Sequence, residues 1–360
     1  MTAEAALFLH GVVLPDGEPR DVYVADGRFS LTPVAGAQTV ADGGYLLPGL
    51  VDAHCHVGLG EHGAVDTADE ARRHAELDRD AGALLLRDAG VPVTFQEVYD
   101  DPELPQIIHA GRHIARPKRY QRGFAIEVEP EELVATVEAQ ARVGDGWVKL
   151  VGDWIDRDLG DLAPLWPGDV LAAAIGRAHE LGARVAVHTF GEEALPDLVA
   201  AGVDSIEHGT GLTADLLDDV VRAGCALVPT TLNVDNFTGI ADSATRFPVY
   251  ADRMRRLEAS SRDRLRDAHE AGIPVYVGTD AGSMLPHGLV VEEIIRLTEI
   301  CMSPEQALAA GSWEARRWLG LPGIEEGAPA DVVVYDADPR ADISVLRAPR
   351  RIVVRGRVVR

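Results

Sequence analysis

Lysine is the scarcest charged residue in this chain of 360 amino acids: the 34 basic residues are Lys118, Lys149 and thirty-two arginines. Cysteine is also rare, with three widely spaced residues and no CxxC pair. This number and spacing exclude a disulfide framework and indicate a reducing compartment. Aromatic residues make up only 5% of the chain, whereas alanine and glycine are abundant, which suits close packing of helices on a sheet.

Acidic residues outnumber basic ones by 58 to 34, which gives the chain a net charge of −24. A chain of this charge repels phosphate backbones and anionic membranes, so we expect no nucleic acid and no membrane among its partners. No apolar run approaches the roughly 20 residues that cross a bilayer. The start of the chain also has no basic segment followed by a sustained apolar stretch. We therefore expect a cytoplasmic protein without a signal peptide, which acts on a small-molecule substrate.

Glycine-rich phosphate loops are missing as well, because neither GxGxxG nor GxxxxGK[ST] opens a helix, and this argues against an open doubly wound sheet. Residues 47–326 instead alternate short apolar runs with amphipathic stretches, in which apolar residues recur three and four apart. Eight runs alternating with helices predict an α/β fold, a closed (β/α)₈ TIM barrel. The runs are LLPGLVDAHCHV, ALLLRDAG, QIIHAGR, WVKLVGD, RVAVHTF, DSIEHGT, CALVPTT and PVYVGTDAG.

Both ends of the chain have a different character, with short alternating strands broken by PDG and DG turns. Neither end could bury a sheet face alone. We therefore expect residues 1–46 and 327–360 to pair into one small β-sandwich domain beside the barrel. Barrel enzymes of this composition often form homo-oligomers, so we also expect self-association, although no stretch of the sequence marks an interface.

Six side chains with metal-binding or nucleophilic chemistry directly follow apolar runs. In a barrel the carboxyl ends of the strands share one mouth, where these side chains would meet. His54 and His56 are two residues apart and so face the same side of a strand. Taken singly, HxH is a weak signal and each of the others could be a core or capping residue. A core or capping role for every one of these residues is less convincing, because it would have to hold independently at each successive strand end. The six are His54, His56, Lys149, His188, His208 and Asp280.

Histidine nitrogen and carboxylate oxygen suit a borderline metal such as Zn²⁺. Four histidines and an aspartate exceed the needs of one tetrahedral ion with an open position, so we expect two divalent ions and a bridge. Lys149 offers that bridge, because an amine with a depressed pKa can add CO₂ and become a carbamate with two oxygens. Arginine stays protonated and cannot do so. The competing interpretation is a lysine in an ordinary ion pair.

Several segments together resemble the amidohydrolase superfamily, and most closely its imidazolonepropionase and prolidase-like dipeptidase branch. They are LLPGLVDAHCH, LLLRDAG, WVKLV, AHELGARVAVHTFG, AGVDSIEHGT, ALVPTTL, VGTDAGSMLPHG and EEGAPADVVVYDADPRADI. The resemblance runs from about residue 44 to the C-terminal end. It implies a more buried metal held by His54 and His56, a second metal held by His188 and His208, and a bridge from carboxylated Lys149. Asp280 would contact the first metal and the hydroxide that the two ions share.

The sequence departs from this branch in two segments that should lie over the barrel mouth. Dipeptidase-type relatives often have a GGHG stretch after the third strand, where this chain reads RHIARPKRYQRG. They also tend to follow the lysine with a glycine-rich segment, where this chain reads VGDWIDRDLGDLAPLWPG. Imidazolonepropionase-type relatives generally use one metal and lack the lysine, so Lys149 argues against that activity. The metal site is thus expected, while the substrate stays open.

The pattern favours a binuclear hydrolase that cleaves an amide bond in a dipeptide, an N-acyl amino acid or a cyclic amide. Two cations would make hydroxide available near neutral pH, and Asp280 would move its proton to the leaving amine. The alternatives are a lactonase or other ester hydrolase, a mononuclear deaminase, and a non-catalytic metal-binding scaffold. A deaminase would need a separate acid/base, for which Glu207 is a candidate, but the residue before His208 in a strand should face away from the interior.

Other residues have supporting roles in this hypothesis. Tyr120 and His287 are candidate substrate contacts, although His287 could equally be an exposed loop residue. Arg87 and Asp88 end the second run, where we expect an ion pair that supports the site. The segment 231–260 is long for a βα connection, which is typical of a lid over the substrate. Two tryptophans are candidates for the pocket wall: Trp154 and Trp166.

Overall fold

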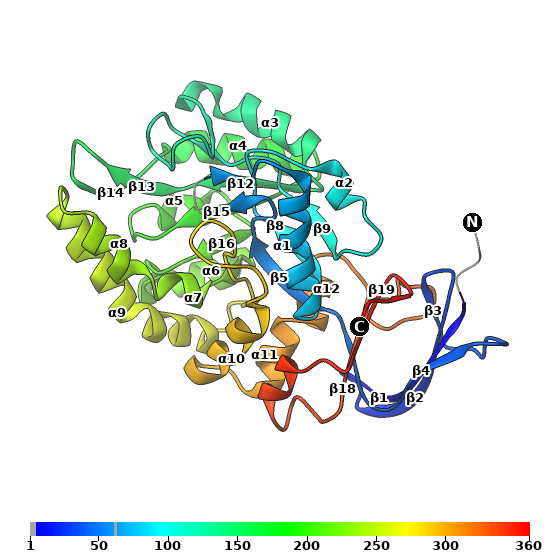
Figure 1. The fold of residues 1–360 in the computed structure, drawn as a ribbon. Coiled ribbons are helices and arrows are strands. Elements are labelled where there is room, and N and C mark those ends of the chain that lie inside the picture. The colour runs from blue at the N-terminus through cyan, green and yellow to red at the C-terminus, as the bar shows by residue number, and fades with distance from the viewer. Residues whose placement is uncertain (1–4, 61–62) are drawn as a thin grey trace.

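The computed structural model describes residues 5–60 and 63–360 and has two parts, an α/β body and a smaller sheet near both chain ends (Figure 1). Residues 1–4, which belong to the start considered for a signal peptide, lie outside the described residues. Of the helices in the described ranges, none combines the length and apolar character that crossing a bilayer requires.

The body is built on parallel strands. Three of them form one sheet in the order β5-β8-β9, and six form another in the order β11-β10-β12-β15-β16-β17. Every residue of β5, β8, β12 and β16 is buried, as expected for strands that helices cover on the outside and side chains cover on the inside. The strands are β5 Leu50–Cys55, β8 Ala83–Asp88, β9 Gln106–His109, β10 Ile114–Ala115, β11 Ile126–Glu127, β12 Trp147–Val151, β15 Arg184–Thr189, β16 Ser205–His208 and β17 Ala226–Val228.

The eighth predicted run, PVYVGTDAG, joins the two sheets without becoming a regular strand. Isolated parallel bridges pair Val275 with Leu227 and Ala281 with Cys55. The backbone turns left-handed at Asp280 (φ 59°), which interrupts a regular ladder there. The third run also breaks, between β9 and β10. Across the described residues the structure is therefore an α/β fold, but regular pairing does not close it into the eight-stranded barrel that the sequence predicts.

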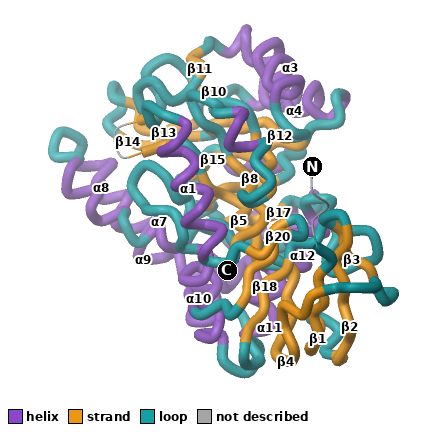
Figure 2. Tube along the Cα trace, turned by 45° about the vertical axis from the view of Figure 1, so that its right-hand side comes forward, coloured by secondary structure: helices purple, strands orange, loops and turns teal. Residues whose placement is uncertain are grey.

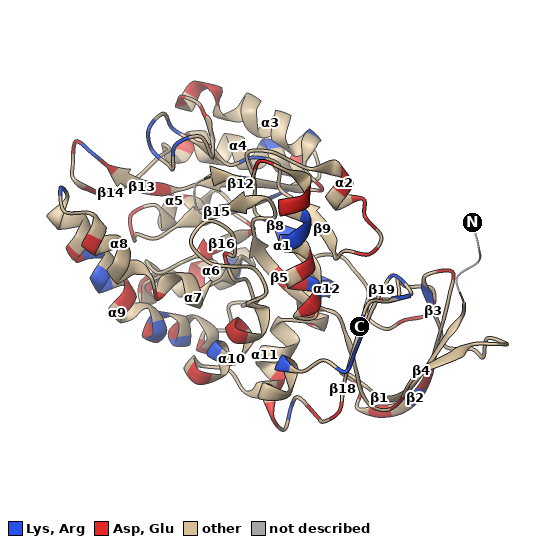
Figure 3. Cartoon of the chain, viewed as in Figure 1, with Lys and Arg blue, Asp and Glu red and all other residues tan. Residues whose placement is uncertain are grey.

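Helices lie outside these strands (Figure 2). In α4, for example, Leu171, Ala174, Ile175 and Ala178 are buried, a spacing of three and four that turns one face to the sheet. Charged residues gather on the outer helices, most visibly on α9 (Figure 3). The helices of the body are α1 Ala68–Asp80, α2 Gln96–Tyr99, α3 Leu133–Val143, α4 Gly168–Glu180, α5 Leu195–Ala200, α6 Leu217–Ala223, α7 Thr231–Val234, α8 Phe237–Ser243, α9 Pro248–Glu270, α10 Val290–Ile300, α11 Pro304–Ala310 and α12 Trp313–Trp318.

The smaller sheet takes strands from both chain ends, in agreement with the small terminal β domain expected from the sequence. Its order is β20-β19-β18-β4-β1-β2-β3. Buried and partly buried residues alternate along β1, so one face packs on a separate apolar core. Hydrogen bonds join all seven strands into one sheet, whereas a sandwich of two sheets was expected. The strands are β1 Leu7–Val13, β2 Glu18–Ala25, β3 Arg28–Ser30, β4 Gln38–Pro48, β18 Val332–Tyr335, β19 Arg351–Val354 and β20 Arg357–Val358.

Two insertions stand at the carboxyl ends of the parallel strands. The antiparallel hairpin of β13 (Asp153–Asp156) and β14 (Asp161–Pro164) follows β12. The helices α7, α8 and α9 follow β17. The two insertions share an apolar cluster that includes Leu162, Phe190, Phe237, Tyr250 and Met254. This cluster holds the hairpin and the helices together over the strand ends, and so places the long segment 231–260 beside the predicted site.

Candidate metal centre

The structure brings the six predicted ligands together at the carboxyl ends of the parallel strands. Asp280 Oδ1 lies 3.2 Å from His54 Nε2 and 3.0 Å from His56 Nε2. Lys149 Nζ lies 3.5 Å from His54 Nε2. These contacts join side chains from β5, from β12 and from the eighth run. Residues that are 95 and 224 positions apart in the sequence therefore share one cluster.

The remaining two histidines complete the cluster from β15 and β16. His188 Nδ1 lies 3.0 Å from His208 Nε2. The rings of His54 and His208 have their centroids 5.2 Å apart. Ligand atoms of His54, His208 and Asp280 all fall within 4.8 Å of one another, so these three side chains could share a metal ion. Below, the six residues are called the ligand cluster.

The protonation states in the cluster suit a metal ion. Burial lowers the pKa of His188 well below its usual range and lowers that of His208 to about 3, so both imidazoles are neutral, the form that binds metals. Burial opposes ionisation of Asp280, yet its electrostatic interaction and hydrogen bonds with His54 and His56 hold the pKa of this carboxyl well below its usual value. His188 Nε2 is buried without a hydrogen-bond partner, a free donor atom that a metal would satisfy.

Lys149 sits in the middle of β12, and only 1% of its surface is exposed. Burial, with a smaller contribution from the nearby Arg87, lowers the pKa of its amine to about 8, although Glu207 and Asp280 oppose the shift. A larger share of neutral amine is therefore present near pH 7 than on an exposed lysine. The other lysine, Lys118, lies exposed in the loop after β10. Of the two lysines, only Lys149 has the setting that carbamate formation needs.

A buried ion pair supports the cluster, but its partners differ from the expected ones. Arg87 Nη2 donates to Glu207 Oε1 over 2.8 Å, whereas Asp88 accepts hydrogen bonds from Tyr99 and from backbone amides. The expected pair of Arg87 with Asp88 is therefore wrong. Glu207 Oε2 also lies 2.6 Å from His54 Nδ1. This contact fixes the ring of a ligand from behind, as outer carboxylates do in metal sites.

Glu207 also corrects the expectation that it faces away from the interior. Strand alternation would separate it from His208, but the backbone of His208 is left-handed (φ 67°), and both side chains turn inward. Thr230, left-handed as well (φ 45°), contacts His208 Nδ1 through its hydroxyl at 2.7 Å. Asn233 donates to Asp280 Oδ2 over 2.6 Å. Strained backbone at three positions thus directs ligands and their supports to one point.

One buried residue beside the cluster was missed by the sequence reasoning. His113 follows β9, and both of its ring nitrogens are buried without hydrogen-bond partners. Its ring centroid lies 5.2 Å from that of His56 and 5.2 Å from that of Tyr120. Burial and the neighbouring His56 keep its pKa well below the usual range, so the ring is neutral. The signal was available, since His113 lies directly before β10, but its segment was interpreted only as a departure from GGHG.

A cavity of about 850 Å³, open to solvent at its mouth, lies over the ligand cluster. Asn233, Ile240 and Tyr250 line it, so the segment 231–260 forms part of its wall, and a lid over the substrate stays a prediction. Five aromatic rings form much of its side, and we call them the aromatic wall: Tyr120, Phe124, Trp154, Phe190 and Tyr250. The wall includes two of the candidates named from the sequence, a substrate contact and a wall residue.

Two other candidates lie outside this cavity. His287 Nδ1 bonds to Asp78 Oδ2 over 2.8 Å, and its ring stacks on His74, so it is neither an exposed loop residue nor a lining residue. Trp166 is buried and donates through Nε1 to the carbonyl of Val151 over 2.8 Å. In both cases a local polar partner draws the side chain into the body and away from the cavity.

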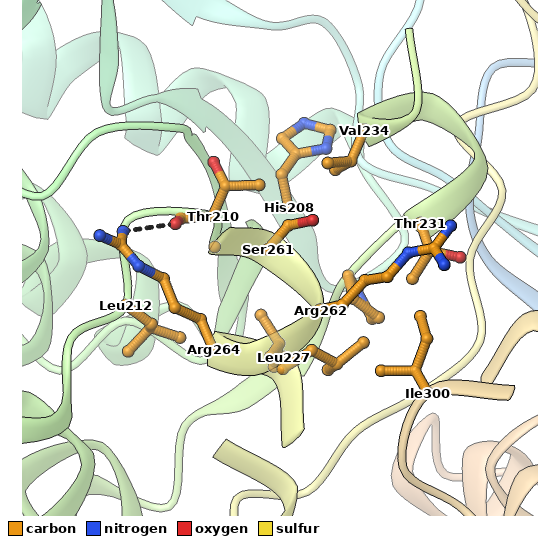
Figure 4. Close-up of a pocket in the computed structure, with 13 residues that line it drawn as sticks. His208, Thr210, Leu212, Leu227, Thr231, Val234, Ser261, Arg262, Arg264 and Ile300 are labelled. Atoms are coloured by element: carbon orange, nitrogen blue, oxygen red, sulfur yellow. Dashed lines mark hydrogen bonds between the residues drawn. The ribbon is translucent and has the colours of Figure 1, made fainter. Parts of the chain in front are cut away.

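A second, smaller cavity of about 370 Å³ lies on another side of His208, between the strand ends and α9 (Figure 4). Arg262 and Arg264 line it, and Figure 4 shows their guanidinium groups turned to opposite sides. Arg264 Nη1 donates to the carbonyl of Thr210 over 2.6 Å. Its Nη2 donates to Glu192 over 2.9 Å. The two arginines line this smaller cavity and not the one over the ligand cluster.

Comparison with known proteins settles the family of this chain. The sequence model of the amidohydrolase family matches residues 131–359. The chain belongs to the amidohydrolase family. This amidohydrolase is therefore a hydrolase that acts on carbon–nitrogen bonds, as the sequence motifs predicted.

The relatives of this amidohydrolase agree with the branch expected from its motifs. An uncharacterized protein of Mycobacterium tuberculosis is 56% identical over 352 residues, which cover 98% of this chain and 95% of the relative. An imidazolonepropionase of Ralstonia nicotianae is 23% identical, with 91% of this chain and 89% of the relative covered. The crystal structure of a Xaa-Pro dipeptidase with bound methionine superposes with a TM-score of 0.81 at 22% identity, covering 98% and 99% of the two chains. This last likeness shows a shared fold.

Proposed function

We propose that this amidohydrolase is a binuclear metal-dependent enzyme that cleaves the amide bond of a small molecule at the mouth of an (β/α)₈ barrel. One observation carries the proposal: the buried amine of Lys149 lies among four histidines and an aspartate at strand ends. The isolated bridges of the eighth run to both parallel sheets support such a barrel. The proposed domains are residues 47–326 for the barrel and residues 1–46 with 327–360 for the small β domain.

The ligand cluster would hold two divalent ions, which we propose to be Zn²⁺ because nitrogen and carboxylate ligands suit it. When bound, the ions would lower the pKa of a shared water and polarise the carbonyl that it attacks. The neutral amine of Lys149 would form a bond to the carbon of CO₂ and lose one proton to solvent. The resulting carbamate carries one negative charge over two oxygens. Arginine could not take this role, since its guanidinium stays protonated.

Asp280 would carry the proton of the reaction. Its carboxylate is ionised and turned toward His54 and His56 through Oδ1, while Oδ2 accepts the amide hydrogen of Asn233. It would accept the proton of the attacking water and deliver it to the nitrogen that leaves. Glu207 would keep the ring of His54 in place from behind. The aromatic wall would exclude water from the reacting carbonyl.

Three other functions stay as alternatives with different consequences. A lactonase or ester hydrolase would use the same ligand cluster. A mononuclear deaminase would need a free acid/base, but Glu207 is engaged by Arg87 and His54 and does not line the cavity, which counts against it. A non-catalytic scaffold would bind metal without turnover.

Metal analysis and a substrate screen test the proposal together. The metal-loaded protein would be assayed against dipeptides, N-acyl amino acids, cyclic amides, anilides and lactones, with Lys149→Ala as the inactive variant and Lys118→Ala as the matched control. We expect two metals per chain and amide hydrolysis that is lost only in Lys149→Ala. One metal per chain would favour the deaminase, and two metals without turnover would favour the scaffold. Hydrolysis of lactones but not of amides would favour the lactonase or esterase. Full metal content and activity in Lys149→Ala would contradict the carbamate.

A further inference from the structure

Along the part of its lining that the structure describes, the cavity over the ligand cluster has no charge outside that cluster. Among its described lining residues, the side chains beyond the six ligands are apolar, aromatic, hydroxyl or amide groups, with no further Asp, Glu, Lys, Arg or His. The chain as a whole is 26% charged, so this composition sets the cavity apart from the outer helices, where charges gather (Figure 3). The part of a substrate that lies away from the reacting carbonyl therefore meets a neutral surface.

Arginines close to this surface are already engaged by the protein itself. Arg119, next to Tyr120 in sequence, bonds to Asp156 and to the carbonyls of Trp154 and Ala163. Arg253 on α9 pairs with Asp161 over 2.9 Å. These contacts hold β13, β14 and α9 together. Each guanidinium is thus neutralised within the frame of the cavity and does not belong to its lining.

The aromatic wall indicates which neutral groups this surface prefers to bind. Aromatic residues are 5% of the chain, yet five of them line this cavity. The rings of Tyr120 and Trp154 meet edge to face with their centroids 4.7 Å apart, and Trp154 lies 5.3 Å from His188. Trp154 is half-buried, so part of its ring stays available to a ligand. A flat aromatic group would stack on this wall within reach of the reacting centre.

We propose that the substrate carries no charged group and bears an aromatic ring that packs on the aromatic wall. This inference rests on the proposed amide hydrolysis and narrows it. A free carboxylate or ammonium packed on the aromatic wall, away from the ligand cluster, would lose hydration without gaining a counter-charge from the described lining residues. Anilides and aromatic cyclic amides fit these walls. Dipeptides and N-acyl amino acids, which carry terminal charges, do not.

Matched anilides test the inference directly. We would compare N-acyl anilides with a para-methyl, a para-carboxylate or a para-aminomethyl group, each as the acetyl, propionyl and benzoyl compound. The three para groups are similar in size and differ in charge. We expect kcat/KM for the methyl compounds to exceed that for both charged compounds by about 100-fold, the scale set by an unpaired buried charge. A charged compound that is cleaved as well as its neutral partner would overturn the inference.

Binding measurements separate this inference from the proposed function. Calorimetric titration of the same anilides into metal-loaded and metal-free protein would rank their affinities without turnover. Tighter binding of the neutral compounds without hydrolysis would uphold the substrate class and refute the amidase. Hydrolysis of amides together with tightest binding of a charged compound would uphold the amidase and refute the proposed substrate class. If no neutral compound bound measurably, the inference would fail.

A designed counter-charge gives a second test. Ile240 on α8 lines the cavity and is half-buried. Ile240→Arg would supply the missing cation, so the para-carboxylate compound should gain about tenfold in kcat/KM or affinity. Ile240→Met, which changes shape but not charge, is the matched control and should leave the ranking unchanged. The same ranking in both variants would show that charge balance in the cavity does not control selection.

Discussion

The ligand cluster forms the floor of the cavity, and the aromatic wall forms its side. The two regions are held together by different kinds of contact. On the floor, polar partners hold several ligands: His56 donates to the carbonyl of Gly90 over 2.8 Å, and His208 and Asp280 are fixed by Thr230 and Asn233. On the side, the aromatic wall rests on ring-to-ring contacts, such as that of Phe190 with Phe237 at 4.5 Å. The floor comes from parallel strands, whereas most of the wall comes from a loop, a hairpin and α9.

This difference assigns different tasks to the two regions. Directed hydrogen bonds fix the positions of reacting groups, and buried strands keep them rigid. Apolar contacts between insertions accept changes of side chain at lower energetic cost, so they can adapt to different substrates. Changes on the floor should therefore abolish activity or unfold the protein. Changes in the wall should alter substrate choice and leave metal content intact.

Replacing Lys149 should have the largest effect. Lys149→Ala removes the proposed carbamate, and we expect loss of metal and a fall in kcat/KM of about 10³-fold or more. Elemental analysis and the anilide assay would measure both. Acetate or propionate, which brings two oxygens into the space that the side chain leaves, should restore part of both quantities. Mass spectrometry under native conditions should find CO₂ on the wild type and not on Lys149→Ala.

Lys118→Ala is the control for this prediction, because it removes the chain's other lysine from an exposed loop. It should keep the metal content and the activity of the wild type. Equal losses in the two variants, or no effect of removing CO₂ and bicarbonate during metal loading, would contradict the bridging role of Lys149.

The ion pair behind His54 should give the next largest effect. Glu207→Gln leaves the buried guanidinium of Arg87 without its counter-charge, and we expect a loss of about 3–5 kcal/mol in the free energy of unfolding. Metal affinity should fall about 10- to 100-fold, because His54 loses its outer carboxylate. Urea unfolding and metal titration would measure the two. Glu138→Gln, which breaks a surface pair with Arg177, is the control and should have a much smaller effect.

Glu293 anchors the start of the segment 231–260 and should make stability depend on pH. It is buried in α10 and accepts hydrogen bonds from Thr231 and from the amide of Leu232, where the covering segment begins. Burial raises its pKa from 4.5 to about 7. A raised folded-state pKa means that the folded protein binds this proton more tightly. The stability that the proton contributes is complete below pH 4.5 and is lost as the pH rises through about 7.

This loss should amount to about 3 kcal/mol across that window. Burial also raises the pKa values of Asp52 and Asp153 to about 7, so these carboxyls titrate in the same window. Urea unfolding of metal-free protein between about pH 5 and pH 8 would therefore show the Glu293 contribution as the part of the slope that Glu293→Gln removes. The neighbouring Glu292 is partly exposed and bonded to Arg347, which lowers its pKa. Glu292→Gln should therefore keep the wild-type slope in this window. An unchanged slope in Glu293→Gln would place the titration elsewhere.

The same contrast explains how much could be predicted from the sequence. The ligand cluster was readable because each member directly follows an apolar run, and parallel strands bring their ends to one edge. The family likewise followed from local motifs. Glu207 was misjudged because a left-handed residue, His208, breaks the alternation on which the prediction rested. No residue pattern announces such a break.

The wall was harder to predict, because its residues meet only through tertiary packing. Trp154 and Trp166 look alike in the sequence, but Trp166 finds the carbonyl of Val151 and turns inward. His287 sits after the eighth run as a substrate contact would, yet Asp78 on α1 captures it. The single closed barrel was expected from eight regular runs, and the two interrupted runs could not be told from regular strands by composition.

Trp154 offers the smallest and most selective change. Removing its ring should lower kcat/KM for neutral anilides about tenfold, the value of one aromatic contact, while the metal content stays at that of the wild type. The ring touches Tyr120 and His188 but contributes no atom to the ligand cluster, so stability should change little more than for another half-buried tryptophan. Trp313→Ala, on α12 outside the cavity, is that control and should leave kcat/KM unchanged. If Trp154→Ala instead lost its metal, the aromatic wall would support metal binding as well as substrate choice. The division of tasks between the two regions would then be wrong.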